Sequence, residues 1–233
     1  IEIWYIRPYI PTSPIDFKIM SIKINYLKKT YSKTSANLVL FTDEKYKING
    51  LKKYLSNSEF SYINDLLKTN DLKKNLLIFE VNSKKKIVLL SIKNNFKTSD
   101  IENLGAEFHG RINYGKNCDY FLNADSIIAK HSNFLGHFLH GLKLKSYEFT
   151  KYKSKKEKRI INIYVVGNKN KPSNQHQLKF KALEEGTFYT RDLVSEPGNI
   201  LHPDEYAKRL NSLKKYGLKI TIYEEKKLKK LGM

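Results

Sequence analysis

The sequence has little of several features that assign a protein to a class directly. Its 233 residues include one cysteine, Cys118, which excludes an intramolecular disulfide and fits a reducing compartment. No apolar run approaches the ~20 residues that span a bilayer. Residues 1–19 contain three prolines but lack the basic start, apolar centre and small-residue cleavage site of a signal peptide, so export is not indicated.

Acidic residues are also scarce, since 43 Lys and Arg stand against 23 Asp and Glu, a formal net charge of +20. A charge of this size can indicate nucleic acid or an anionic membrane as partner. Lys, Asn, Ile, Tyr and Phe are all abundant, however, as expected from an A/T-biased gene that places Lys at solvated positions. We interpret the charge as compositional and expect at most weak, salt-sensitive binding to nucleic acid.

Motifs of the common catalytic and phosphate-binding sites are missing. The sequence has no GxSxG, and Cys118 has no compelling histidine partner. His137 and His140 can share a helix face, but neither an HExxH motif nor a cysteine pair accompanies them, so zinc is not indicated. The other histidines are His109, His131, His176 and His202, for which packing or surface roles are expected.

Two further patterns have ordinary explanations. Gly105, Gly110 and Gly115 match neither GxGxxG nor GxxxxGK[ST], and we expect them to lie in or to end a helix. Asp192 and Glu196 are spaced like paired acids, but Asp192 falls in the last turn of a predicted helix, where a salt bridge is the usual role. From the residues alone we expect no catalytic, cofactor-binding or metal-binding residue.

The hydrophobic pattern predicts strands that alternate with helices, and therefore an α/β fold. Strands are predicted at 22–26, 37–41, 76–81, 87–92, 119–122, 160–166 and 218–223, the third and fourth of them as a hairpin. Helices are predicted at 60–68, 99–114, 124–147, 173–195, from 203 to about 216, and at 224–231. A Ser99-x-x-Glu102 capping box is expected to open the second helix.

Residues 191–203, RDLVSEPGNILHP in one-letter code, mark the end of one helix and the start of the next. Pro197 biases Glu196 away from the α region, so the first helix is expected to end there. Pro203 suits the first turn of a helix, and the two acids that follow it lie near the positive end of the helix dipole.

The same stretch resembles the R-D-L-x-x-E-P-x-N-x-x-x-P signature of the leucyl aminopeptidase family, also called cytosol aminopeptidases or peptidase M17. Residues 141–156 resemble the family's G-x-x-L-x-S-Y-x-F-x-x-Y-K-S-K-K segment, and Gly186 and the closing Leu228-x-x-Leu231-Gly232-Met233 follow in family order. Ser195 departs from the family, which usually has Asn before the Glu-Pro pair. The resemblance is specific from about residue 136 onward and weak before it.

The resemblance implies a cytoplasmic metallo-aminopeptidase that removes N-terminal residues from peptides, with two divalent cations, Mn or Zn, and a hexameric assembly. The family's metal-binding and catalytic residues lie beyond the Leu-Gly-Met point, so this chain is expected to bind no metal and to be inactive alone. The alternative is a macro-like module that binds a nucleotide or nucleic acid and has no peptidase activity, although that role needs a glycine-rich phosphate loop.

The implied domains are a leader that is non-native or disordered at 1–19, a macro-domain-like mixed sheet flanked by helices at 20–172, a linker helix at 173–195, and the first elements of an α/β exopeptidase domain at 196–233. Met20 is expected to be the natural start, because a cleaner pattern begins there.

Overall fold

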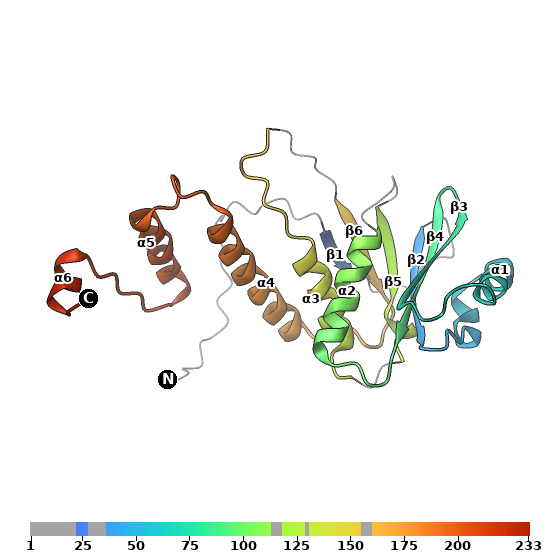
Figure 1. The fold of residues 1–233 in the computed structure, drawn as a ribbon. Helices are drawn as coiled ribbons and strands as arrows, with labels where there is room; N and C mark the ends of the chain where they lie inside the picture. Colours follow the sequence, from blue (N-terminus) through green and yellow to red (C-terminus); the bar gives the residue numbers. More distant parts are fainter. Residues whose placement is uncertain (1–21, 28–35, 113–117, 129–130, 155–159) are drawn as a thin grey trace. The chain divides into compact units, whose positions relative to one another are not determined.

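The computed structural model describes residues 22–27, 36–112, 118–128, 131–154 and 160–233 (Figure 1). The predicted leader at 1–19 and Met20 lie outside these residues. Contacts divide the described chain into two units, one that ends at Phe188 and one formed by Tyr189–Met233. Each unit is described by itself.

The first unit is built on a six-stranded sheet with the strand order β1-β6-β5-β2-β4-β3 (Figure 1). All neighbouring strands run parallel except β3, which pairs with β4 in the antiparallel sense. The strands are β1 (Ile22–Tyr26), β2 (Asn37–Asp43), β3 (Leu76–Asn82), β4 (Lys85–Ile92), β5 (Asp119–Asn123) and β6 (Ile161–Val166). The mixed α/β sheet and the predicted hairpin are thereby confirmed.

Helices cover both faces of the central strands, and this explains why β2 reads as an unbroken apolar run. Val39 and Phe41 of β2 face a core formed with α2 (Thr98–Ile112) and α3 (Phe134–Lys145). Leu38 and Leu40 point to the opposite side, into a core shared with η1 (Asn49–Tyr54) and α1 (Asn57–Leu67). Alternate side chains therefore enter two different cores, as expected for a strand buried on both faces.

The α1 layer is attached to the sheet through a buried ion pair. Ser56 and Glu59 form a capping box at the start of α1, in which each side chain accepts a hydrogen bond from the other residue's backbone N–H. The Glu59 carboxylate also contacts Lys85 Nζ of β4, with side chains only 11% and 6% exposed. Burial raises the pKa of Glu59, but hydrogen bonds from Lys85 and Ser56 outweigh it and the net pKa is lowered.

Helices α2 and α3 approach each other closely through two glycines. A Cβ atom added to Gly105 would overlap the carbonyl oxygen of Phe138, and one added to Gly141 would overlap the carbonyl oxygen of Glu102. Gly110, which lies in α2 like Gly105, has open space where its Cβ would lie. Gly105 and Gly110 lie within α2 as expected, while Gly115 falls outside the described residues.

The predicted helix over 124–147 is wrong at 124–128 and 131–133, while 129–130 lie outside the described residues. Residues Ala124–Ser126 form the short helix η2, and α3 begins only at Phe134, after Asn133 in the left-handed conformation with φ 57°. The polar side chains of η2 form hydrogen bonds with other parts of the first unit. Ser126 Oγ accepts from Phe41 N at 3.0 Å, and the Asp125 carboxylate accepts from the backbone of Asn168 and of Lys169.

The predicted Ser99–Glu102 capping box is also wrong. Helix α2 begins at Thr98, so Ser99 lies inside its first turn. The cap is made two residues earlier, where Asp100 accepts a hydrogen bond from Lys97 N at 2.8 Å. Glu102 instead accepts a hydrogen bond from His137 Nδ1 on α3 at 3.0 Å.

Helix α4 (Asn174–Ser195) starts and ends where the sequence predicts. In the first unit its Phe180 ring lies 5.0 Å from the rings of both His137 and His140, and Glu184 lies 3.2 Å from His140 Nδ1. The division between the two units falls inside α4, between Phe188 and Tyr189. The predicted boundaries at 20–172, 173–195 and 196–233 remain predictions.

The second unit contains α5 (Pro203–Asn211), η3 (Ser212–Tyr216) and α6 (Glu225–Lys230). Pro203 occupies the first turn of α5, and Gly217 ends η3 with φ 83°, both as predicted. The predicted strand at 218–223 is wrong, because these residues have no regular secondary structure. A strand requires a hydrogen-bonded neighbour, and none of the six strands of the described chain pairs with this segment.

Candidate functional site

The signature stretch forms a tight connection between α4 and α5. The carbonyl of Pro197 accepts hydrogen bonds from Ile200 N and Leu201 N, both at 2.9 Å. His202 is the extended residue before α5, and its carbonyl accepts from Tyr206 N. The proline at 197 thus stops one helix and supplies the acceptor that turns the chain towards the next.

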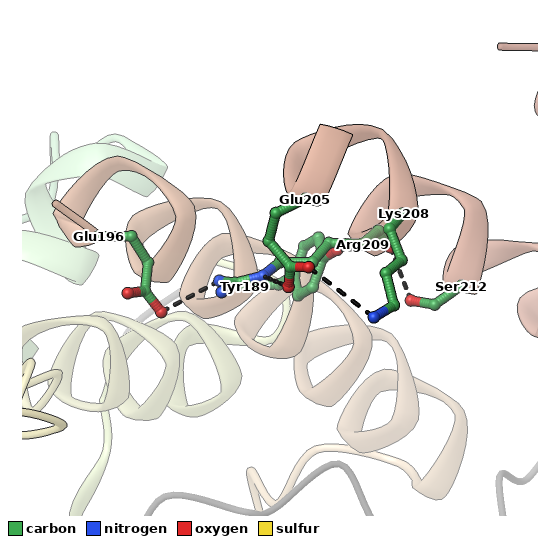
Figure 2. Close-up of polar contacts among 6 residues, drawn as sticks. All are labelled: Tyr189, Glu196, Glu205, Lys208, Arg209 and Ser212. Atoms are coloured by element: carbon green, nitrogen blue, oxygen red, sulfur yellow. Dashed lines mark hydrogen bonds and ion pairs between the residues drawn. The ribbon is translucent and has the colours of Figure 1, made fainter. Parts of the chain in front are cut away.

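Arg209 of α5 holds this connection in place (Figure 2). Its Nη1 donates to Glu196 Oε1 at 3.0 Å, and its Nε donates to Glu205 Oε1 at 2.9 Å. The Arg209 carbonyl accepts from the hydroxyl groups of Tyr189 and Ser212 at 2.9 and 2.6 Å. One residue therefore joins the end of α4, the Glu-Pro turn and both ends of α5.

The electrostatics of this cluster are those of a structural clamp. The hydrogen bond from Arg209, with a smaller contribution from Lys208, lowers the pKa of Glu205, and the same bond raises the pKa of Arg209. Burial raises the pKa of Tyr189. The Glu196 side chain is only 2% exposed and already ion-paired, so it lacks access to a substrate. Glu196 and Asp192 therefore do not form a pair of free acids.

The histidine side chains contact different polar partners. His137 and His140 share a face of α3, as expected, but their Nδ1 atoms contact different carboxylates, Glu102 and Glu184. His109 is buried in α2, where burial and, secondarily, Lys145 lower its pKa. His131 contacts Thr98 and Ser132, and His176 contacts Ser173.

The contact between α3 and α4 holds a buried polar pair. His140 and Glu184 are 9% and 10% exposed. Burial lowers the pKa of the neighbouring Lys143. Burial, with a contribution from Glu184, raises the pKa of Tyr26 to about 12. These groups are packed between helices, so we assign them to holding α4 on the first unit rather than to chemistry.

A two-metal centre does not fit the residues that the structure describes. In that part of the chain no three His, Cys, Asp or Glu side chains converge closely enough to hold a metal ion. Cys118 is partly buried just before β5. None of the described helices is both long and apolar enough to cross a membrane.

Two hollows lie where loops follow the carboxyl ends of the parallel strands. The larger, about 250 Å³, is lined by residues that precede or open α3 and α4: Ile127, His131, Asn133, Phe134, Asn170, Lys171, Pro172, Ser173 and His176. The smaller, about 150 Å³, lies beside Asp43, Lys45 and Asn94, after β2 and β4. Ligands of open α/β sheets bind at this edge.

The fold is similar to that of a leucine aminopeptidase. A mutant of tomato leucine aminopeptidase matches with a TM-score of 0.70 and 16% identity, over 94% of this chain and 48% of that one. The bottromycin maturation enzyme BotP matches with a TM-score of 0.60 and 15% identity, over 85% of this chain, and one of its matching structures is a complex with Mn.

Sequence relatives point in the same direction. A probable cytosol aminopeptidase of Dinoroseobacter shibae is 39% identical over 93 residues, which are 40% of this chain and 19% of that protein. One from Phytoplasma mali is 35% identical over 127 residues, 52% of this chain and 25% of that protein. These relatives confirm the predicted resemblance to the leucyl aminopeptidase family. No protein-family model matches the chain.

The chain thus spans about half the length of the tomato enzyme, and its matches to the two relatives span 19% and 25% of their length. Sequence reasoning missed the role of Arg209. Its spacing from Glu205, four residues earlier on a helix, is a signal that could have found half of the cluster. The partner Glu196 lies across the turn and needed the fold.

Proposed function

We propose that this chain is the N-terminal portion of a cytoplasmic, metal-dependent leucyl-type aminopeptidase that releases N-terminal amino acids from peptides. The observation that carries the proposal is the agreement between two independent comparisons. The structure matches 48% of a leucine aminopeptidase along 94% of this chain, and the sequence relatives are cytosol aminopeptidases.

The chemistry of the described residues limits the part that this portion plays. They offer no set of ligands for two cations, and Glu196 of the signature stretch is ion-paired with Arg209. The Mn or Zn ions, the catalytic groups and the hexamer contacts would then belong to the rest of such an enzyme. This portion would supply the N-terminal unit, the linker helix α4 and the first elements of the catalytic domain.

The unpaired segment at 218–223 supports this assignment. Its apolar and polar residues alternate, and Leu218, Ile222 and Tyr223 are 49%, 43% and 51% exposed. Alternation of this kind is typical of a strand with one buried face. In the complete enzyme we expect this segment to pair with a neighbouring strand and to bury its apolar side chains.

The test begins with the gene sequence that follows the codon of Met233. The longest reading frame and the 233-residue chain are expressed and purified side by side, and hydrolysis of leucine-p-nitroanilide is measured with and without added Mn²⁺ or Zn²⁺. We expect metal-dependent release of p-nitroaniline by the longer protein only. Metal-dependent turnover by the 233-residue chain, lost on substitution of a residue within it, would contradict the proposal, as would an inactive longer protein.

A further inference from the structure

The titratable side chains that line the larger hollow of the first unit are all basic. Three of its side chains, His131, Lys171 and His176, are basic, and none of its lining residues is an Asp or Glu. Asp125 lies on the same side of the sheet, but its Oδ1 already accepts from two backbone N–H groups at 2.8 and 2.6 Å. The lining itself therefore offers basic side chains and no carboxylate.

Lys171 is fixed in position rather than free to swing in solvent. Its Nζ donates to the carbonyl of Leu27 at 2.7 Å, just after strand β1. An ammonium group has three N–H donors, so this bond leaves donors for a second acceptor. A lysine anchored through one hydrogen bond loses less conformational freedom on binding a ligand than an unanchored one.

The other two basic side chains of the hollow are held by short local contacts. Ser173 Oγ accepts from His176 N at 3.2 Å and lies 3.1 Å from His176 Nδ1, which fixes the imidazole at the start of α4. His131 Nδ1 donates to the Ser132 carbonyl at 2.7 Å. The basic side chains therefore come from both segments that border the hollow, the one before α3 and the one before α4.

Apart from Asn133 and Asn170, the remaining lining is apolar and buried. Ile127, Phe134 and Pro172 provide it, and Ile127 and Phe134 are 7% and 3% exposed. An apolar floor with a few polar groups that converge on it is the usual composition of a small-molecule site. The volume of about 250 Å³ suits a small ligand rather than a polymer.

We propose that this hollow binds a small organic anion, a phosphate monoester or a carboxylate whose compact apolar body lies against Ile127, Phe134 and Pro172. Lys171 and His176 contact the anionic oxygens, and the anchoring of Lys171 on Leu27 links the occupied site to the end of β1. The inference concerns the first unit alone, and its outcome is independent of peptidase activity.

The experiment titrates the 233-residue chain with phenyl phosphate, benzoate, inorganic phosphate and uncharged benzyl alcohol at physiological salt. Binding is followed by NMR shifts of the histidine ring protons and of the backbone amides at 170–176. We expect saturable shifts confined to the lining residues, with a Kd in the low millimolar range. The tighter of phenyl phosphate and benzoate identifies the anionic group, and inorganic phosphate and benzyl alcohol bind more weakly than that probe.

Three variants make the test specific. Lys171→Gln is expected to weaken binding about tenfold, because it removes a charge-assisted hydrogen bond. His176→Gln leaves the Leu27 contact intact and is expected to weaken binding several-fold, so it decides the question if Lys171→Gln unfolds. Lys73→Gln removes the same charge from an exposed turn outside the hollow and should leave the Kd within twofold.

Equal weakening by Lys73→Gln would overturn the proposal, because binding would then follow the net charge of the chain and not the hollow. It is equally overturned if no probe gives saturable shifts at the lining residues, or if benzyl alcohol binds as tightly as the tighter of phenyl phosphate and benzoate.

Discussion

The close contact of α2 and α3 allows a strict test of the packing, because one helix carries both a crowded and an uncrowded glycine. In Gly105→Ala the new methyl group meets the backbone of Phe138 and Leu142, which cannot rotate away as a side chain could. In Gly110→Ala the methyl group meets no atom within 4 Å. Both changes raise the helix propensity of α2 by the same amount, so the difference between them isolates the packing.

The magnitudes follow from these surroundings. Replacing Gly by Ala within a helix stabilises by about 1 kcal/mol, and we expect up to this gain for Gly110→Ala. Overpacking costs about 1–3 kcal/mol and more where backbone must move. For Gly105→Ala we therefore expect a net loss of about 2 kcal/mol. Gly141→Ala meets the backbone of Glu102 and should cost as much. The double variant should cost less than the sum, because both methyl groups separate the same two helices.

Urea denaturation followed by circular dichroism measures these changes. With an m-value of about 2 kcal/mol/M, a loss of 2 kcal/mol lowers the midpoint by about 1 M, whereas Gly110→Ala should raise it by up to about 0.5 M. An unchanged m-value would show that the unfolded state is the same. A midpoint for Gly105→Ala equal to that of Gly110→Ala would refute the close contact.

Three further predictions rest on buried charges. The folded-state pKa of His109 is lowered, so the unfolded chain takes up the proton first and stability falls as the pH drops below about 6.5; urea midpoints between pH 7 and 5 should fall less for His109→Leu than for the parent chain. Lys85→Met leaves the buried Glu59 carboxylate without the Lys85 ammonium group and should cost about 3–5 kcal/mol in the free energy of unfolding. Most of this loss should be regained in the double variant Lys85→Met/Glu59→Gln. A Lys85→Met variant as stable as the parent would contradict the role of the ion pair. Arg209→Met should speed hydrogen exchange at the amides of Ile200 and Leu201 about a hundredfold, equivalent to about 3 kcal/mol. The control is Lys208→Met, which should leave these rates unchanged because the Lys208 side chain is 83% exposed. Equal exchange rates in the two variants would contradict the role of Arg209 in holding the turn.

The sequence predicted those parts of the fold that depend on local patterns. Alternation and apolar runs located β1 to β6, and proline placed the end of α4 and the start of α5. The errors occur where partners distant in the chain decide. Residues 124–133 have helical composition, yet Ser126 bonds to β2 and Asp125 to the loop after β6. The segment 218–223 has the pattern of a strand but no partner among the described residues.

The same distinction applies to the candidate sites. The signature stretch was recognisable in the sequence, but that Glu196 is buried against Arg209 depends on a turn whose geometry the letters do not contain. The hollow before α3 and α4 is lined by residues about 40 positions apart in the chain, so no local sequence motif indicates it. The resemblance to the leucyl aminopeptidase family depends only on local similarity, which is why the sequence alone was sufficient to show it.

The position of β1 has a consequence for synthesis on the ribosome. Its neighbour in the sheet is β6, with Ile22 opposite Ile161. At about 5–20 residues per second, the partner is made about 7 to 28 seconds after β1. During that interval β2, β3, β4 and β5 can already assemble, while the first strand has no neighbour to bond. Of the six described strands, β1 leaves the ribosome first and is therefore the last to join the sheet, and a chaperone that binds nascent chains would find it available for that time.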